Sequence, residues 1–115
     1  MKIKEKIDGS VAILTLSGKM MGGPETQSVH DHIKGLISDG IINVVIDLGD
    51  VKWMNSSGLG SLMAGLTTLR GSGGDLKLVH VPDRVKRPIE ITKLDQVIKM
   101  YESLDEAVTS FEEGE

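Results

Sequence analysis

The chain opens with two short runs in which apolar and polar residues follow a strand-like pattern. Residues 3–7 mix isoleucines with charged residues, as a half-exposed strand does. Asp8-Gly9 favours a hairpin turn, and a more apolar run at 11–16 follows it. The beginning of the sequence therefore predicts an antiparallel β-hairpin.

The rest of the chain alternates helical and strand-like patterns. Pro24 suits the first position of a helix that ends at Asp39-Gly40. The run at 41–46 is the most apolar strand candidate, and such a run suits a central strand covered on both faces. Ser103 and Glu106 match a capping box for a last helix, which runs through Phe111. A second helix is predicted to begin in the segment 55–58 and to end at the glycines of 71–74, and a strand at 76–81 follows it. A third helix runs from Arg84 to about Thr92, with Asp83 as its cap and a kink at Pro88, and it is followed by a strand at 97–100.

This order of elements predicts an α/β fold. Alternating strands and helices imply a mostly parallel sheet covered by helices, and the opening hairpin adds one antiparallel strand. We expect a single domain over residues 1–115, with a mixed, mostly parallel sheet of four to five strands and about four helices. Residues 112–115 are expected to form a frayed acidic tail.

Composition excludes several classes of function. The chain contains no cysteine, so it has no disulfide, no thiolate metal site and no cysteine nucleophile. Its formal net charge is −4 and its basic residues are scattered, which argues against binding to nucleic acid. No stretch approaches the ~20 apolar residues of a membrane span, and the first residues do not resemble a signal peptide. We therefore expect a cytoplasmic protein without direct membrane insertion.

Glycine clusters and histidines have structural explanations. The clusters at 22–23 and 71–74 lack the Lys-Ser/Thr ending of a P-loop, so they are interpreted as turns and helix ends. His30 and His32 are two residues apart on a helix and point in different directions, and His80 stands alone. No metal site and no nucleotide site is predicted.

A local basic cluster lies in the predicted third helix and just after it. It consists of Arg84, Lys86, Arg87 and Lys93. A solvated helix face is the first interpretation of such a cluster. A contact with an acidic partner stays open, since complementary fields steer association.

The segment at 47–60 is the strongest candidate for a functional site. It is expected to be a polar loop at the carboxyl end of the central strand, where open α/β sheets place their sites. Trp53 and Met54 pack into the core, which is the first interpretation, or join a contact surface. Ser56 is either a helix cap or an exposed hydroxyl. A phosphate there would add about −1.5 to −2 charges, which a helix N-terminus accommodates.

A catalytic serine is not expected in this segment. The residues around Ser56 and Ser57 do not form the G-x-S-x-G elbow of a hydrolase, and no histidine follows in a triad context. A small serine hydrolase is therefore only a third hypothesis, and we expect no enzyme.

At these residues the chain resembles a known family. Asp47-Leu48 together with Met54-Asn55-Ser56-Ser57-Gly58-Leu59-Gly60 resembles the signature of STAS domains, especially bacterial anti-sigma factor antagonists. The resemblance covers nearly the whole chain. It includes the hairpin that ends in Gly18, the Gly73-Gly74 turn and the helix that contains Val85-Lys86-Arg87.

The resemblance implies a switch without a cofactor of its own. The unphosphorylated protein is expected to bind an anti-sigma factor, commonly also a serine kinase, and so to release a sigma factor. The kinase, which holds the ATP, would phosphorylate Ser56, and a serine phosphatase would restore the active form. The partner-binding residues implied are Met21, Gly22, Asn55, Ser56, Ser57 and Gly58, and no metal ligand is implied.

Two positions depart from the family pattern. Asn55 stands where the family usually has Asp before the target serine, and Gly18-Lys19-Met20-Met21 lacks the acid of the Gly-x-Leu-Asp pattern. Both departures make the local surface less negative. An alternative therefore stays open, in which the chain is an unphosphorylated STAS subunit of a larger signalling or transporter assembly.

Overall fold

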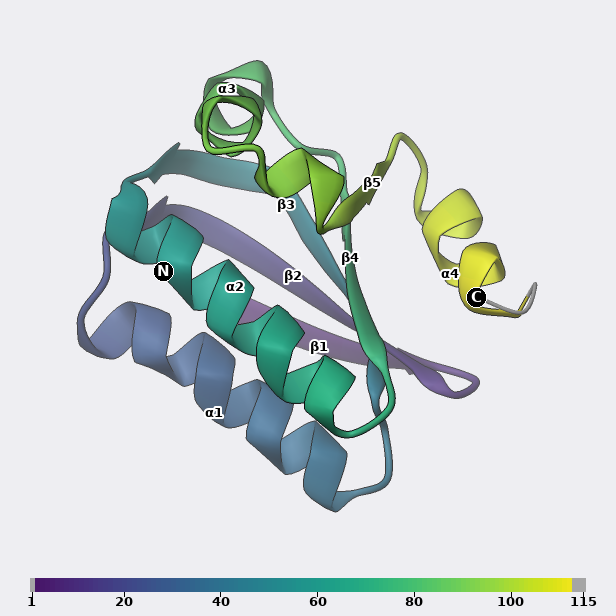
Figure 1. Cartoon of the computed structure of the whole chain (residues 1–115). Coiled ribbons are helices and arrows are strands. Elements are labelled where there is room, and N and C mark those ends of the chain that lie inside the picture. Colours follow the sequence, from purple (N-terminus) through teal and green to yellow (C-terminus); the bar gives the residue numbers. More distant parts are fainter. Residues whose placement is uncertain (1, 113–115) are drawn as a thin grey trace.

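The structure is a computed structural model that describes residues 2–112, without the side chain of Glu25. Its centre is a five-stranded sheet in the order β1-β2-β3-β4-β5 (Figure 1). β1 and β2 are antiparallel, and the other neighbouring strands are parallel. The predicted α/β fold with a mixed sheet is confirmed. The elements are β1 Lys2–Asp8, β2 Val11–Met20, α1 Pro24–Ser38, β3 Asn43–Met54, α2 Ser56–Gly71, β4 Asp75–Val79, α3 Asp83–Ile91, the 3₁₀ turn η1 Leu94–Gln96, β5 Lys99–Tyr101 and α4 Leu104–Glu112.

The opening hairpin forms where the sequence pattern predicts it. Asp8 pairs with Val11, so Gly9 and Ser10 make the turn between β1 and β2. Gly9 takes a φ of 63°, a left-handed conformation that glycine adopts without steric penalty. The hairpin prediction is therefore confirmed.

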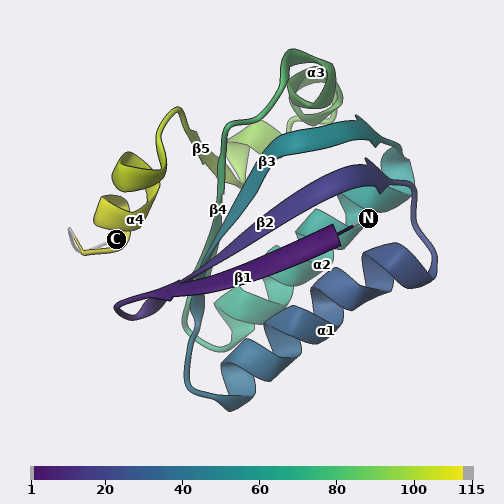
Figure 2. The same ribbon diagram turned by 180° about the vertical axis from the view of Figure 1, so that it is seen from behind.

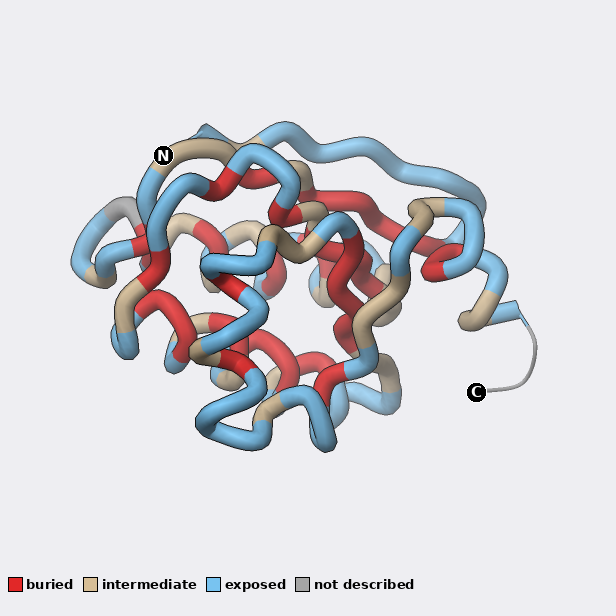
Figure 3. The backbone as a smooth tube through the Cα atoms, turned by 90° about the horizontal axis from the view of Figure 1, so that it is seen from above, coloured by how far each residue is buried: buried red, intermediate tan, exposed pale blue. Residues whose placement is uncertain are grey.

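Helices cover the two faces of the sheet unequally. α1 and α2 lie side by side on one face, and α3 lies near the carboxyl end of β3, as two opposite views show (Figures 1 and 2). A large aliphatic core fills this side, and it includes Leu14, Ile33 and Leu66. On the other face α4 covers a smaller cluster around Val45 and Val79. Burial is concentrated in the middle strands and the inner helix faces, whereas β1 is largely exposed (Figure 3).

A buried lysine lies beneath α4. Lys77 of β4 is fully buried, and its Nζ donates a hydrogen bond of 2.6 Å to Ser110 Oγ. The same Nζ lies 4.0 Å from the centre of the Phe111 ring, which is within the range of a cation–π interaction. These contacts connect α4 to β4.

The central strands are longer than the sequence pattern predicts. β3 continues to Met54 and α2 begins at Ser56, so the expected polar loop after Asp47 is wrong, and only Asn55 lies between the strand and the helix. β2 likewise continues to Met20, and the two strands stay paired across register shifts near Ser17 and Gly18. The sequence pattern does not predict this extension, because the added residues include polar residues and glycines. They stay in strands through pairing with residues about thirty positions away in sequence.

Three smaller boundaries also differ from the prediction. β4 ends at Val79, because His80 takes a left-handed φ of 56° and cannot continue the strand. Pro82, and not Asp83, is the N-cap residue of α3. β5 begins at Lys99, because η1 precedes it.

Other local signals for helices are confirmed. Pro24 is the first residue of α1, and Pro88 lies inside α3. The backbone N–H of Glu106 donates to Ser103 Oγ over 3.1 Å, as the capping box predicts. Glu112 belongs to α4, and the rest of the predicted frayed tail lies outside the described residues.

Candidate functional site

Parallel pairing of β2 and β3 brings the two halves of the predicted site together. Met20 is paired with Met54 at the ends of the two strands, so the residues that follow each strand become neighbours. The backbone N–H of Asn55 donates to the Met20 carbonyl over 3.2 Å. The predicted residues Met21 and Gly22 therefore lie beside the segment 55–58, although more than thirty residues separate them in sequence.

Asn55 holds this junction with both ends of its side-chain amide. Its Oδ1 accepts a hydrogen bond of 2.9 Å from the backbone N–H of Gly58, which makes Asn55 the N-cap of α2. Its Nδ2 donates to the Met21 carbonyl over 3.0 Å. An ionised aspartate could make the first bond but not the second, because a carboxylate has no hydrogen to donate. Asn55 therefore makes a hydrogen bond to the Met21 carbonyl that the Asp of the family pattern could not make.

Ser56 is the first residue of α2, and it is exposed. The interpretation of Ser56 as the helix cap is therefore wrong, because Asn55 makes the cap. The first turn of α2 contains no acidic side chain. Free amides and the helix dipole at such an end favour an anion, so the position can accept added negative charge.

Two glycines allow the chain segments to approach closely. A Cβ on Gly58 would overlap the Met20 carbonyl oxygen and lie 2.9 Å from Met20 Cβ. Gly22 takes a φ of 89°, and a Cβ there would lie 2.7 Å from the Cβ of Ser57. Gly58 is buried, so it positions the first turn of α2 and offers no side chain to a partner. Ser57, like Ser56, is exposed.

Thr26 supports the same junction from α1, and sequence reasoning missed it. Its side chain is only 1% exposed, and its Oγ1 accepts a hydrogen bond of 2.9 Å from the backbone N–H of Gly22. The signal was weak, because threonine side chains near helix ends often bond to backbone groups close by in the sequence.

Large apolar side chains flank the serine. Met21 is 46% exposed and Trp53 is 53% exposed, whereas Met54 is only 7% exposed. The expectation that Trp53 and Met54 pack together into the core is therefore correct for Met54 and wrong for Trp53. Trp53 and Met54 are neighbours at the end of β3, so their side chains point to opposite faces, and Trp53 is directed away from the core that Met54 joins.

His32 and His80 form separate contacts elsewhere. Nδ1 of His32 lies 3.1 Å from Glu5 Oε1, and Nδ1 of His80 lies 3.2 Å from Asp47 Oδ2. Within residues 2–112, no group of three or more His, Cys, Asp or Glu side chains is arranged to hold a metal ion. None of the helices in the described chain combines the length and apolarity needed to span a bilayer.

Comparison with known sequences gives a consistent result. A family model described as STAS domain matches residues 2–107. A Thermotoga maritima protein named as a candidate anti-sigma factor antagonist is 31% identical over 72 residues, which cover 63% of this chain and 64% of the relative's length. An anti-sigma-B factor antagonist of Staphylococcus aureus is 27% identical over 100 residues, which cover 87% of this chain and 83% of the relative.

Solved structures share the fold. The crystal structure of a candidate anti-sigma factor antagonist from Thermotoga maritima superposes with a TM-score of 0.86 at 25% identity, covering 94% of this chain and 92% of that chain. The anti-sigma factor antagonist SpoIIAA in its unphosphorylated form superposes with a TM-score of 0.82 at 14% identity, covering 96% of each chain. At that low identity the likeness to SpoIIAA shows the fold alone.

Proposed function

Because this chain belongs to the STAS domain family, we propose that it is an anti-sigma factor antagonist whose partner surface is centred on Ser56. The relatives that share its sequence are named for this activity. In the proposed function, the unphosphorylated protein binds an anti-sigma factor that is also a serine kinase. A sigma factor is thereby released in the cytoplasm.

One observation carries the proposal, which is the exposed hydroxyl of Ser56 at the mouth of α2. A kinase needs access to that oxygen, and the protein must keep its fold after the phosphate is added. Asn55 already caps α2, so modification of Ser56 removes no cap. The helix N-terminus also stabilises an anion nearby.

Partner release follows from desolvation. A partner that covers a neutral hydroxyl cannot accommodate a phosphate dianion without a matching cation. Burying an uncompensated charge costs about 3 kcal/mol or more, which corresponds to about a 100-fold loss of affinity. A serine phosphatase reverses the change, and ATP is bound by the kinase.

The exposed apolar side chains suit a contact surface of this kind. Met21 is bonded through its carbonyl to Asn55, and Trp53 precedes Ser56 by three residues. Both side chains are exposed, and tryptophan is among the residue types that dominate binding energy at interfaces. We include Trp53 with Met21, Gly22, Asn55, Ser56 and Ser57 in the proposed surface. Gly58 acts from beneath it, by allowing α2 to approach β2.

The test uses the partner that affinity capture of the native protein identifies. Calorimetric titration should show that Ser56→Ala keeps the wild-type affinity and that Ser56→Asp weakens it by about 100-fold. Thr67→Asp is the matched control, because it adds the same charge at an exposed position further along α2. Equal binding by Ser56→Ala and Ser56→Asp would contradict the switch.

A second candidate function rests on Asn55 and Met21. Neither position carries the carboxylate of the family pattern, so the surface that a kinase would meet is less negative. In that case the chain acts as an unphosphorylated STAS subunit of a larger signalling or transporter assembly. Phosphosite mapping on the captured protein separates the two functions: a phosphate on Ser56 favours the switch, and co-purification with a transporter without phosphate favours the assembly.

A further inference from the structure

A positively charged groove lies beside the proposed partner surface. It has a volume of about 700 Å³ and is lined by the ends of β1, β2 and β3 and by the start of α3. The lining includes one carboxylate, that of Asp50, and the four cations Lys2, Lys19, Lys52 and Arg84. The whole chain has a formal net charge of −4, so this positive charge is a local feature.

Strand pairing places these charges close together. Lys2 pairs with Ser17 across the hairpin, and Ser17 pairs with Asp50 of β3. Neighbouring strands lie about 4.8 Å apart, so this row spans about 10 Å. The Debye length at physiological ionic strength is about 8 Å, so a ligand over the middle of the row lies within range of Lys2 at one end and of Asp50 at the other. The three further cations of the lining outweigh this single carboxylate.

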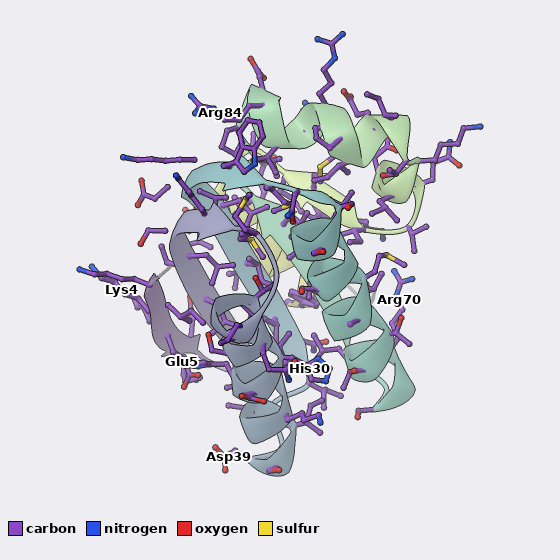
Figure 4. All side chains as sticks on the ribbon, turned by 90° about the vertical axis from the view of Figure 1, so that its left-hand side faces the viewer. Lys4, Glu5, His30, Asp39, Arg70 and Arg84 are labelled. Atoms are coloured by element: carbon purple, nitrogen blue, oxygen red, sulfur yellow. The ribbon has the colours of Figure 1, made fainter. Side chains whose placement is uncertain are left out.

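Arg84 connects α3 to the groove. Its Nη1 donates a hydrogen bond of 3.1 Å to the backbone carbonyl of Lys52. Figure 4 shows Arg84 where α3 meets the end of the sheet, and Lys4 pointing outward from β1. Glu5 bonds to His32 of α1, and strand side chains alternate between faces. Lys4 therefore lies on the face away from α1 and extends the positive surface.

The cations of the groove outnumber its single carboxylate, that of Asp50. Among residues 2–112, the ion pairs join His32 to Glu5, Arg70 to Asp75 and His80 to Asp47, and none involves a lysine of the groove. All four cations are exposed, so they attract an anionic partner at long range.

We propose that this groove binds an acidic polypeptide segment of the partner that docks at Ser56. Its position supports this occupant, because Lys52 directly precedes the exposed Trp53 and Lys19 pairs with Trp53 in the sheet. A protein that covers Trp53 therefore reaches the groove. A small free anion would occupy only a small part of a groove of about 700 Å³, and a long nucleic acid would extend over the negatively charged remainder of the chain. The inference rests on the proposed function only for the source of the segment.

The test uses a fluorescein-labelled oligo-glutamate peptide as the probe and anisotropy as the readout. The single tryptophan, Trp53, gives a second fluorescence signal at the edge of the groove. The groove variant is Lys19→Glu with Lys52→Glu. Its matched control is Lys6→Glu with Lys34→Glu, which makes the same change in charge at exposed lysines outside the groove and outside the basic cluster of α3. Circular dichroism checks that each variant is folded, and the neutral pair Lys19→Gln with Lys52→Gln serves if the reversal does not fold.

We expect the peptide to bind the wild type, to be released by added salt, and to bind the groove variant about tenfold more weakly, with a much smaller loss for the control. Equal losses in the two variants would overturn the proposal. Displacement of the peptide by inorganic phosphate, added at the same total negative charge as the peptide, would indicate a small-anion site instead. Tighter binding of a single-stranded oligonucleotide than of the peptide would indicate a nucleic-acid site. The peptide does not require Ser56, so failure here leaves the switch intact, and failure of Ser56→Asp to release the partner leaves the groove intact.

Discussion

Replacing Asn55 by alanine removes two hydrogen bonds that fix the N-terminus of α2 against the end of β2. The side chain accepts from the Gly58 N–H over 2.9 Å and donates to the Met21 carbonyl over 3.0 Å. Loss of an N-cap costs about 1 kcal/mol, and the second bond contributes about 1 kcal/mol. The free energy of unfolding should therefore fall by about 2 kcal/mol.

Asn55→Asp separates the two contributions. The carboxylate keeps the cap and gains about 0.3–1 kcal/mol from the helix dipole, but it loses the bond to Met21, which contributes about 1 kcal/mol. These changes partly cancel, so the free energy of unfolding of this variant should lie within about 0.7 kcal/mol of the wild-type value.

Urea denaturation followed by circular dichroism measures both variants. Ser57→Ala is the control, because Ser57 is an exposed neighbour and such a change alters stability by less than about 0.5 kcal/mol. A loss below about 0.5 kcal/mol for Asn55→Ala, or an equal loss for the alanine and aspartate variants, would refute the assigned role of the amide.

Two further predictions concern packing and binding. Gly58→Ala should destabilise the fold by about 1–3 kcal/mol in urea denaturation, since the new Cβ would meet the Met20 backbone, whereas Gly60→Ala has open space and should stabilise by about 0.5–1 kcal/mol. Similar changes for both glycines would contradict the proposed close approach. Trp53→Ala should change stability by less than about 1 kcal/mol and weaken calorimetric partner binding by about 2 kcal/mol, or about 30-fold. Ile91→Ala, at an apolar position that is 72% exposed on α3, should leave binding unchanged, and an equal loss there would remove Trp53 from the interface.

Signals that act within a few residues were predicted correctly. The Asp8-Gly9 turn, Pro24 at the start of α1 and the Ser103–Glu106 capping box all appear where the sequence places them. Each depends on backbone geometry or a hydrogen bond between residues at most four positions apart. Such interactions are encoded locally, so a single sequence is sufficient to identify them.

Features that depend on strand pairing were missed or misassigned. The polar segment after Asp47 was expected to be a loop, but pairing with β2 keeps it in β3. The same pairing exposes Trp53 and gives the Asn55 amide a backbone carbonyl to bind, that of Met21. The paired residues of β2 and β3 lie more than thirty positions apart in sequence, so no local pattern predicts their contacts.

The amino-acid sequence by itself determined the order of strands and helices and the serine motif at the start of the second long helix. Only the tertiary structure decided that the Asn55 amide also binds the Met21 carbonyl, that Ser56 is exposed, and that scattered lysines gather with Arg84 around one groove. The physical reason is range: propensities, turns and caps act between near neighbours, whereas exposure and the local electrostatic field depend on which distant segments the sheet brings together.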